Sequence, residues 1–323
     1  MSNLVTTPAF RRHPQVLHIG FSKCASTYLR AVFRSQPKVH LVFKSGFFTP
    51  FLAKDMTFLQ YQSLFRDEHD IVNVESDEHL TLPGIHPELG VRSTTLEQVE
   101  AVADAIKAHL PDVRILMVIR NQAALMTSRY SEYLITGGSL AFEEFAEYMM
   151  GGKDGRNLHY QNHYSRIIDI LESRFPRDHI LVLLQENMRR NPDRTRSAIA
   201  RLLALDNLQE ARKGLKSERR SLSLAGMCIL RTVNRFLVAR SSVGSQPPET
   251  RVPLSFYHLV VKAVRGFDFY VLAHFSRGPE ALLTETRRRN ILDQFREDNL
   301  RLGDRLDVNL TELGYLPDPG TAR

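Results

Sequence analysis

The chain has 323 residues, of which 43% are hydrophobic, a value typical of a globular protein that buries a core and one that argues against intrinsic disorder. Its formal net charge of +7 favours anionic ligands, although charge alone does not separate a nucleotide from an acidic glycan, nucleic acid or an anionic lipid surface. Cys24 and Cys228 lie far apart without the spacing of metal ligands, so we expect neither a disulfide framework nor a structural zinc site.

The N-terminal sequence has no apolar run of the kind found in signal peptides, and no run of about 18 apolar residues occurs along the chain. We therefore expect a cytoplasmic protein. The segment 254–275 is apolar and aromatic, but Lys262, Arg265 and Asp268 interrupt it, so we expect a buried or peripheral helix there. Peripheral contact with the inner face of a membrane is the alternative that this segment leaves open.

In chain order, the first predicted strand is the apolar run 15–19, which leads into Gly20 and then into 27–34, where apolar residues recur at helical spacing. This is the pattern of a strand, a loop and a helix. Other aliphatic or β-branched runs have the length of strands buried on both faces, at 39–43, 71–74, 115–119 and 180–184. Helix-like stretches alternate with them, the clearest being 96–110, which Pro111 follows.

Strands that alternate with helices predict right-handed βαβ units. We therefore expect an α/β fold that is P-loop-like, in three layers α/β/α, with a central, mostly parallel sheet and an inserted helical cap. The predicted organisation is a single domain over 1–323, with a ligand-binding α/β core at 14–205, a helical cap on the acceptor side at 206–290, and a C-terminal helix and tail at 291–323.

The loop from Gly20 to Thr27 joins a buried strand to a helix. Such a loop offers backbone N–H groups and the positive end of the helix dipole, so an anion can bind there. Lys23, Ser26 and Thr27 add side-chain donors. A Walker A loop needs lysine directly before its hydroxyl residue, whereas here the lysine precedes Ser26 by three residues and a second glycine is missing. The spacing argues against an ATPase.

The pattern G-x-x-K-x-x-S-T-x-L after a first strand resembles the 5′-phosphosulfate loop of the sulfotransferases that use 3′-phosphoadenosine 5′-phosphosulfate (PAPS). A second segment follows a later strand and reads Ile119-Arg120-Asn121-Gln122, then Ser128-Arg129-Tyr130. It resembles the 3′-phosphate-binding segment of that family, with arginine and serine eight residues apart. Two motifs in the family's order make the resemblance much more specific than either alone.

Further segments are similar to the family's bacterial, carbohydrate-type branch. They are the stretch from Phe175-Pro176 to Asn191-Pro192, and the C-terminal residues from Phe295 to Asn299 with Gly314-Tyr315. The resemblance covers most of 15–205 and the last thirty residues. It is loose over 206–285, where the family would bind its acceptor.

The resemblance implies transfer of a sulfuryl group from the co-substrate PAPS to a hydroxyl of a carbohydrate or glycolipid acceptor, with no metal ion and no nucleic-acid partner. A non-catalytic nucleotide- or anion-binding relative is the first alternative, and a P-loop kinase or NTPase is the second. Nothing in the sequence predicts an oligomeric state.

The resemblance also implies which residues bind the co-substrate. Lys23 would stabilise the charge that builds on the leaving phosphate, and Arg120 with Ser128 would hold the 3′-phosphate. The residues implied for the 5′-phosphosulfate are Ser22, Lys23, Cys24, Ala25, Ser26 and Thr27.

Two positions depart from the family pattern. Ala25 stands where the loop commonly has glycine, and Ser45 stands where relatives often carry a glutamate that acts as the general base. A base must therefore come from elsewhere, near the carboxyl edge of the sheet. The strand 71–74 leads there into Glu75 and, three residues later, Glu78. We expect Glu78 as the first candidate for the catalytic base and Glu75 as the second, followed by His79 and His40.

Overall fold

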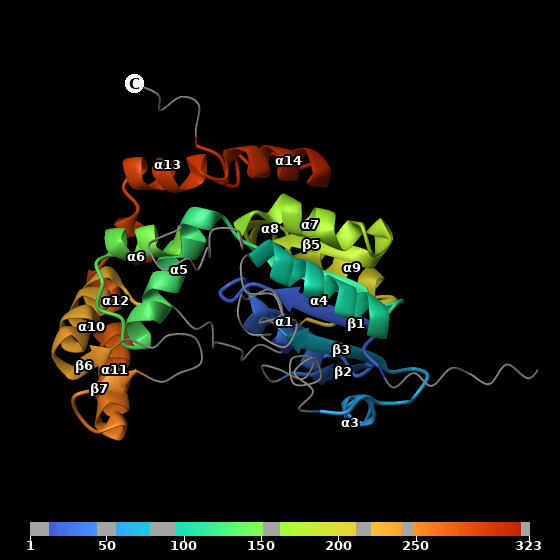
Figure 1. The fold of residues 1–323 in the computed structure, drawn as a ribbon, viewed down its shortest axis with the longest axis horizontal. Coiled ribbons are helices and arrows are strands. Elements are labelled where there is room, and N and C mark those ends of the chain that lie inside the picture. Colours follow the sequence, from blue (N-terminus) through green and yellow to red (C-terminus); the bar gives the residue numbers. More distant parts are fainter. Residues whose placement is uncertain are drawn as a thin grey trace, which may run out of the picture. The chain divides into compact units, whose positions relative to one another are not determined.

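The computed structural model describes residues 13–43, 56–77, 95–150, 162–210, 221–240 and 248–317. The chain divides into two compact units, one of Met1–Ile119 with Tyr164–Lys216 and the other of Arg120–His163 with Ser217–Arg323. The segment 120–163, which the sequence places within the α/β core, is therefore part of the second unit (Figure 1).

The first unit is built on a five-stranded parallel sheet. Its strands are β1 (Val16–Gly20), β2 (Val39–Val42), β3 (Val72–Asp77), β4 (Arg114–Ile119) and β5 (Ile180–Leu184). They lie in the order β2-β3-β1-β4-β5, so β1 is central, and every residue of β1 is buried. All five predicted strands are confirmed, and β3 runs on to Asp77, three residues beyond its predicted end.

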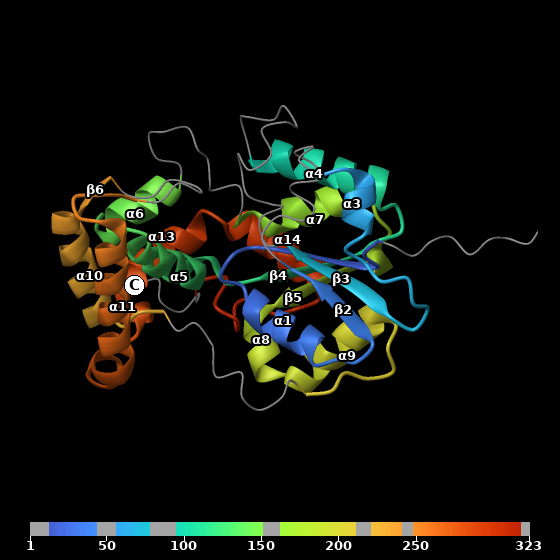
Figure 2. The same cartoon turned by 90° about the horizontal axis from the view of Figure 1, so that it is seen from below.

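Helices cover both faces of this sheet, as Figure 2 shows. One face carries α1 (Ser26–Arg34), α8 (Gln185–Arg190) and α9 (Pro192–Leu203). The other carries α3 (Phe58–Gln62), α4 (Thr95–His109) and α7 (Tyr164–Glu172), and a 3-10 turn, Arg177–His179, precedes β5. The predicted three-layer α/β/α fold with a parallel sheet is confirmed.

The second unit is mainly helical. Its helices are α5 (Gln122–Ile135), α6 (Phe142–Met149), α10 (Leu224–Leu237), α11 (Leu254–Phe267), α12 (Ala273–Phe275), α13 (Glu285–Asp293) and α14 (Arg296–Leu306). A π-helical turn, η4 (Asp268–Leu272), joins α11 to α12, and a 3-10 turn, η5 (Pro279–Leu282), follows. Two short strands, β6 (Val238–Arg240) and β7 (Glu249–Thr250), pair antiparallel. Within the described part of the chain, no helix has the length and apolar character needed to cross a membrane.

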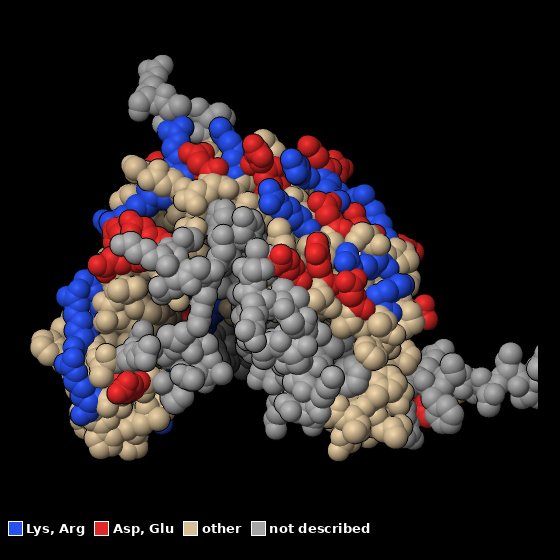
Figure 3. All heavy atoms as spheres, viewed as in Figure 1, with Lys and Arg blue, Asp and Glu red and all other residues tan. Residues whose placement is uncertain are grey.

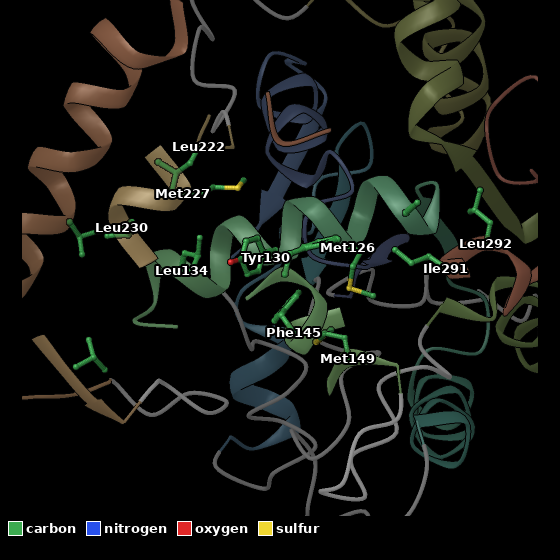
Figure 4. Close-up of a cluster of buried hydrophobic side chains, with 14 of the residues drawn as sticks. Met126, Tyr130, Leu134, Phe145, Met149, Leu222, Met227, Leu230, Ile291 and Leu292 are labelled. Atoms are coloured by element: carbon green, nitrogen blue, oxygen red, sulfur yellow. The ribbon is translucent and has the colours of Figure 1, made fainter. Parts of the chain in front are cut away.

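The core of the second unit gathers around α5. Figure 4 shows Tyr130 of α5 close to Phe145 of α6, and their ring centroids are 5.3 Å apart. Side chains from α10 and α13, among them Leu230 and Ile291, belong to the same buried cluster. Burial of these apolar surfaces supplies most of the stability of such a helical unit.

Buried amides tie the C-terminal segment to the start of α5. Gln122 Nε2 donates to Asn299 Oδ1 at 2.8 Å, and Asn299 Nδ2 donates in return to Gln122 Oε1 at 3.2 Å. Asn299 also donates to the carbonyl of Tyr315 at 2.8 Å. Both amides are almost fully buried, so these bonds replace the water that each side chain loses on folding. The C-terminal residues behind the family resemblance therefore hold the segment that begins with Arg120-Asn121-Gln122.

Replacing Asn299 with alanine should lower the free energy of unfolding by about 2 kcal/mol, because Gln122 Oε1 and the carbonyl of Tyr315 would stay buried without the donor that Asn299 supplies. Urea unfolding followed by circular dichroism measures this. Asn290→Ala, at an exposed position of α13, should change the value by less than about 0.5 kcal/mol. Equal losses in the two variants would contradict the role given to the amide pair.

Candidate anion-binding site

The site is built on the turn from β1 into α1. β1 ends at Gly20, the loop spans 21–25, and α1 begins at Ser26. In the sheet register, Gly20 pairs with Val118 of β4 and Ile19 pairs with Asp77 of β3. Because the strands are parallel, the loop leaves the sheet at its carboxyl edge, where folds of this class bind ligands. The predicted strand, loop and helix are confirmed here.

Two apolar side chains anchor the loop. Phe21 is fully buried and meets the ring of Tyr164 edge-on, with 5.3 Å between centroids. Cys24 is 1% exposed, and its N–H donates to the carbonyl of Phe21 at 3.3 Å. The burial of Cys24 fits a packing residue better than a reactive thiol. Its implied contact with a phosphate stays a prediction.

The loop backbone is left-handed at two residues, Lys23 with φ 70° and Ala25 with φ 61°. Left-handed residues that alternate with ordinary ones curl the backbone so that N–H groups converge on one point, which is how anion-binding nests form. This conformation costs a non-glycine residue about 1–2 kcal/mol. Ala25 thus adopts, at a cost in strain, the conformation that glycine takes easily.

The N-terminus of α1 has no protein cap of its own. Its N-cap residue, Ala25, makes no side-chain hydrogen bond, and the first turn has no acidic residue. Ser26 is 4% exposed, and its hydroxyl has no hydrogen-bond partner. A buried hydroxyl without a partner costs about 1–3 kcal/mol, and the first N–H groups of a helix have no acceptor within the helix. An oxyanion at this point would satisfy both.

The remaining loop residues lie closer to solvent. Ser22 and Lys23 are half-buried, and Thr27 is exposed. The loop therefore combines one buried hydroxyl with cationic and hydroxyl side chains that a ligand can reach from outside. Their implied roles at the phosphosulfate are predictions that this placement allows.

His18 is a polar residue of β1 that the sequence interpretation missed. It is fully buried, its Nδ1 is 2.8 Å from Ser76 Oγ, and its Nε2 has no hydrogen-bond partner. A Cβ added at Gly20 would lie 3.3 Å from that Nε2, so His18 lies directly beneath the start of the loop. Burial, with a smaller contribution from the Arg30 cation, lowers the pKa of His18 to about 3, although Asp77 acts in the opposite direction. The imidazole is therefore neutral at ordinary pH and a weak base.

Glu75, the second candidate for the base, lies inside the sheet. It is 1% exposed and accepts a hydrogen bond of 2.5 Å from the hydroxyl of Tyr61. Burial raises the pKa of Tyr61 well above its usual value, and the charge of Glu75 adds to the effect. Glu75 pairs in register with Leu17, three positions before the end of β1. The hydrogen bond between Tyr61 and Glu75 joins α3 to β3, so it fits a structural role for Glu75.

Of the remaining candidate bases, only His40 lies among the described residues. His40 on β2 makes a hydrogen bond of 3.0 Å through Nε2 to the carbonyl of Leu64. Glu78 and His79 lie outside the described residues, as does Ser45. In the sequence, Glu78 directly follows Asp77, the last residue of β3, which is a strand that pairs with β1.

Arg120 directly follows Ile119, the last residue of β4, and is half-buried. Ser128 lies within α5 and is 5% exposed. Asn121 caps α5 by accepting a hydrogen bond of 2.9 Å from the N–H of Ala124. The binding of a 3′-phosphate by Arg120 and Ser128 stays a prediction from the sequence motif. Among the described residues, no group of three or more His, Cys, Asp and Glu side chains is arranged to hold a metal ion.

The comparisons with known proteins find solved structures of similar fold, but they find no relative by sequence. No protein-family model matches the chain, and a search of curated proteins finds no match. The crystal structure of a sulfotransferase from Alicyclobacillus acidocaldarius has a TM-score of 0.54 at 13% identity, covering 93% of this chain and 98% of that one. The chain therefore has the fold of a sulfotransferase.

Two other solved structures are less similar. Mouse sulfotransferase SULT7A1 complexed with PAP has a TM-score of 0.48 at 12% identity, covering 91% of this chain and 87% of that one. The sulfotransferase domain from the curacin biosynthetic pathway has a TM-score of 0.35 at 11% identity, covering 60% of this chain and 75% of that one. At these TM-scores neither likeness carries an argument about this chain.

The buried neutral state of His18 predicts a loss of stability in acid. The folded pKa of about 3 lies below the ordinary pKa of 6.5 for histidine, so below pH 6.5 the unfolded state binds a proton that the folded state does not bind. Between pH 6.5 and about pH 5 the free energy of unfolding of the wild type should fall by about 2 kcal/mol more than that of His18→Gln. Urea unfolding at both pH values measures this. Parallel losses in the two proteins would show that His18 is not the group responsible.

Replacing Ala25 with glycine should raise the free energy of unfolding by about 0.5 kcal/mol, since the relief of left-handed strain exceeds the added freedom of the unfolded chain. Ala204→Gly should raise the free energy of unfolding by a similar amount, because Ala204 is also left-handed, with φ 54°. Ala200→Gly, within α9, should instead lower the value by about 1 kcal/mol. A loss at Ala25 comparable to that at Ala200 would contradict the strained conformation of the loop.

Proposed function

We propose that the protein is a sulfotransferase that moves a sulfuryl group from PAPS to an acceptor hydroxyl. The observation that carries this proposal is the buried, unpartnered hydroxyl of Ser26 at the uncapped start of α1. It lies at the carboxyl edge of a sheet whose fold is that of a sulfotransferase. The spacing of Lys23, Ser26 and Thr27 supports sulfuryl over phosphoryl transfer, because it does not fit a Walker A loop.

The residues of the loop fit the phosphosulfate end of the donor. A phosphate oxygen at the start of α1 would accept from the Ser26 hydroxyl and from the N–H groups of the first helical turn. The absence of an acidic side chain in that turn leaves the positive end of the helix dipole uncompensated. Arg120 and Ser128 are proposed for the 3′-phosphate, which would distinguish PAPS from nucleotides phosphorylated only at the 5′ position.

The donor supplies an activated sulfuryl group, and the protein has three tasks around it. In the reaction, an oxygen–sulfur bond forms to the acceptor, the bond between sulfur and the 5′-phosphate oxygen breaks, and adenosine 3′,5′-bisphosphate leaves. Ser26 and the start of α1 hold the phosphate in line with the acceptor. Lys23 stabilises the charge that develops on the oxygen being released. The third task is to take the proton of the acceptor hydroxyl.

For that proton we propose Glu78 as the base, because it follows the end of β3, the strand beside β1. Glu75 is a weaker choice, since it lies deeper in the sheet and its carboxylate is engaged by Tyr61. His18 is a poor base because burial lowers its pKa to about 3. We further propose a carbohydrate or glycolipid acceptor and a cytoplasmic location, both on the basis of the sequence alone.

Lys23→Ala should reduce transfer of labelled sulfate from PAPS by about 10²–10³-fold, the effect of losing one donor that stabilises a developing charge. Activity can be measured against a cell extract or a panel of glycans. Lys38→Ala, at an exposed position of the same unit, is the matched control and should keep full activity. Wild type that binds adenosine 3′,5′-bisphosphate but transfers no sulfate to any acceptor would favour the non-catalytic relative. ATP hydrolysis that depends on magnesium and on Lys23 would favour the NTPase.

Arg120→Ala should weaken binding of adenosine 3′,5′-bisphosphate by about 10–100-fold, as expected for one charge-assisted hydrogen bond, and should leave adenosine 5′-monophosphate unaffected. Isothermal titration calorimetry gives both affinities. Arg189→Ala, at an exposed position of α8, serves as control. Equal weakening for the two nucleotides, or none for either, would exclude Arg120 from the 3′-phosphate site.

A further inference from the structure

The helical segment from α11 through η4 to α12 carries apolar side chains that are buried and others that are exposed. On the inner side, Tyr257 and Val261 are buried in the core of the second unit. The same segment carries a set of large apolar side chains in solvent, which we name the aromatic face. Its residues are Phe256 (49% exposed), Leu259 (61%), Phe267 (52%), Phe269 (49%), Tyr270 (76%) and Phe275 (89%). Large apolar side chains gathered in solvent mark an interaction surface.

Hydrogen bonds on the inner side determine which side faces outward. The hydroxyl of Tyr257 donates to Asn234 Oδ1 at 3.0 Å, and Asn234 donates to the carbonyl of Leu134 at 2.7 Å. Farther along, Asp268 accepts from the N–H of Ser223 at 3.0 Å and from its hydroxyl. Rotating the segment to bury the aromatic face would break these bonds inside the core. The exposure of the face is therefore a property of the folded unit.

Exposed cationic side chains lie in the same stretch of the chain as the aromatic face. Between residues 251 and 277 the basic residues are Arg251, Lys262, Arg265 and Arg277, all exposed. The one acidic residue in this stretch is Asp268, which is 4% exposed and is bound by Ser223. In Figure 3, Lys and Arg side chains also gather along the edge of the second unit that carries α10. The face thus offers apolar rings and net positive charge together.

We infer that the aromatic face binds the surface of an anionic lipid bilayer. Aromatic side chains favour the boundary between headgroups and acyl chains, and each Lys or Arg near an anionic membrane adds about a factor of five in affinity. A second copy of the chain fits less well, because a two-fold interface would bring together two faces that both carry net positive charge. The segment would lie in the plane of the membrane surface.

Co-sedimentation with vesicles tests this inference independently of sulfate transfer. The wild type should bind vesicles of phosphatidylcholine and phosphatidylglycerol, and should bind phosphatidylcholine alone at least about tenfold more weakly. The triple variant Phe267→Ser, Tyr270→Ser, Phe275→Ser removes exposed rings, and Lys262→Glu with Arg265→Glu reverses exposed charges. Each variant should lose at least about tenfold in affinity for the anionic vesicles.

Two controls match these variants. Leu59→Ser removes a side chain that is 77% exposed in α3, and Arg296→Glu with Arg301→Glu makes the same change of charge on exposed positions of α14. Both should bind vesicles as the wild type does. Failure of the wild type to bind anionic vesicles, or equal binding by the variants and controls, would overturn the inference. So would a wild-type dimer that becomes monomeric in the triple variant without any vesicle binding.

The charge variant keeps the test decisive if the triple variant does not fold. Lys262 and Arg265 are both exposed, so their reversal leaves the core unchanged, and thermal unfolding should show the same midpoint as in the wild type. Loss of binding with an unchanged midpoint supports the lipid surface as partner. Undiminished binding in that variant counts against it.

Discussion

The turn from β1 into α1 is the constraint on which the proposed site depends. β1 is buried between β3 and β4, so its last residue delivers the chain to the carboxyl edge of the sheet at one fixed point. From there the chain must reverse into α1, and it does so with left-handed backbone at Lys23 and Ala25. The strain and the unpartnered hydroxyl of Ser26 are both costs in the free protein. An anion that accepts from the loop would offset part of them.

The elements that lead into this site could be predicted because their sequence patterns are local. A strand buried on both faces needs a run of aliphatic residues, and a helix buried on one face needs apolar residues at helical spacing. Both patterns can be read from a single sequence, in the five strands and in the helix after Gly20. The parallel sheet and the α/β fold agree with those patterns. Ala25 stands out in the sequence as a departure from the loop that the chain resembles, but only its φ of 61° shows that the backbone there is left-handed.

Other features depend on contacts between residues distant in sequence, and no local pattern predicts them. His18 meets Ser76 only because β3 lies beside β1, and Glu75 is engaged by Tyr61 from a helix that precedes it. The sequence ranked Glu75 by its place at a strand end, whereas β3 runs two residues further. The segment 120–163 was assigned to the α/β core by its order in the chain, yet it forms part of the helical unit, where Gln122 pairs with Asn299.

The proposed site requires that the turn at the start of α1 holds the 5′-phosphate of the donor. A crystal structure with adenosine 3′,5′-bisphosphate measures this directly. A 5′-phosphate oxygen should lie within about 3 Å of Ser26 Oγ and of N–H groups in the first turn of α1. A nucleotide bound elsewhere, with the Ser26 hydroxyl still lacking a partner, would contradict it.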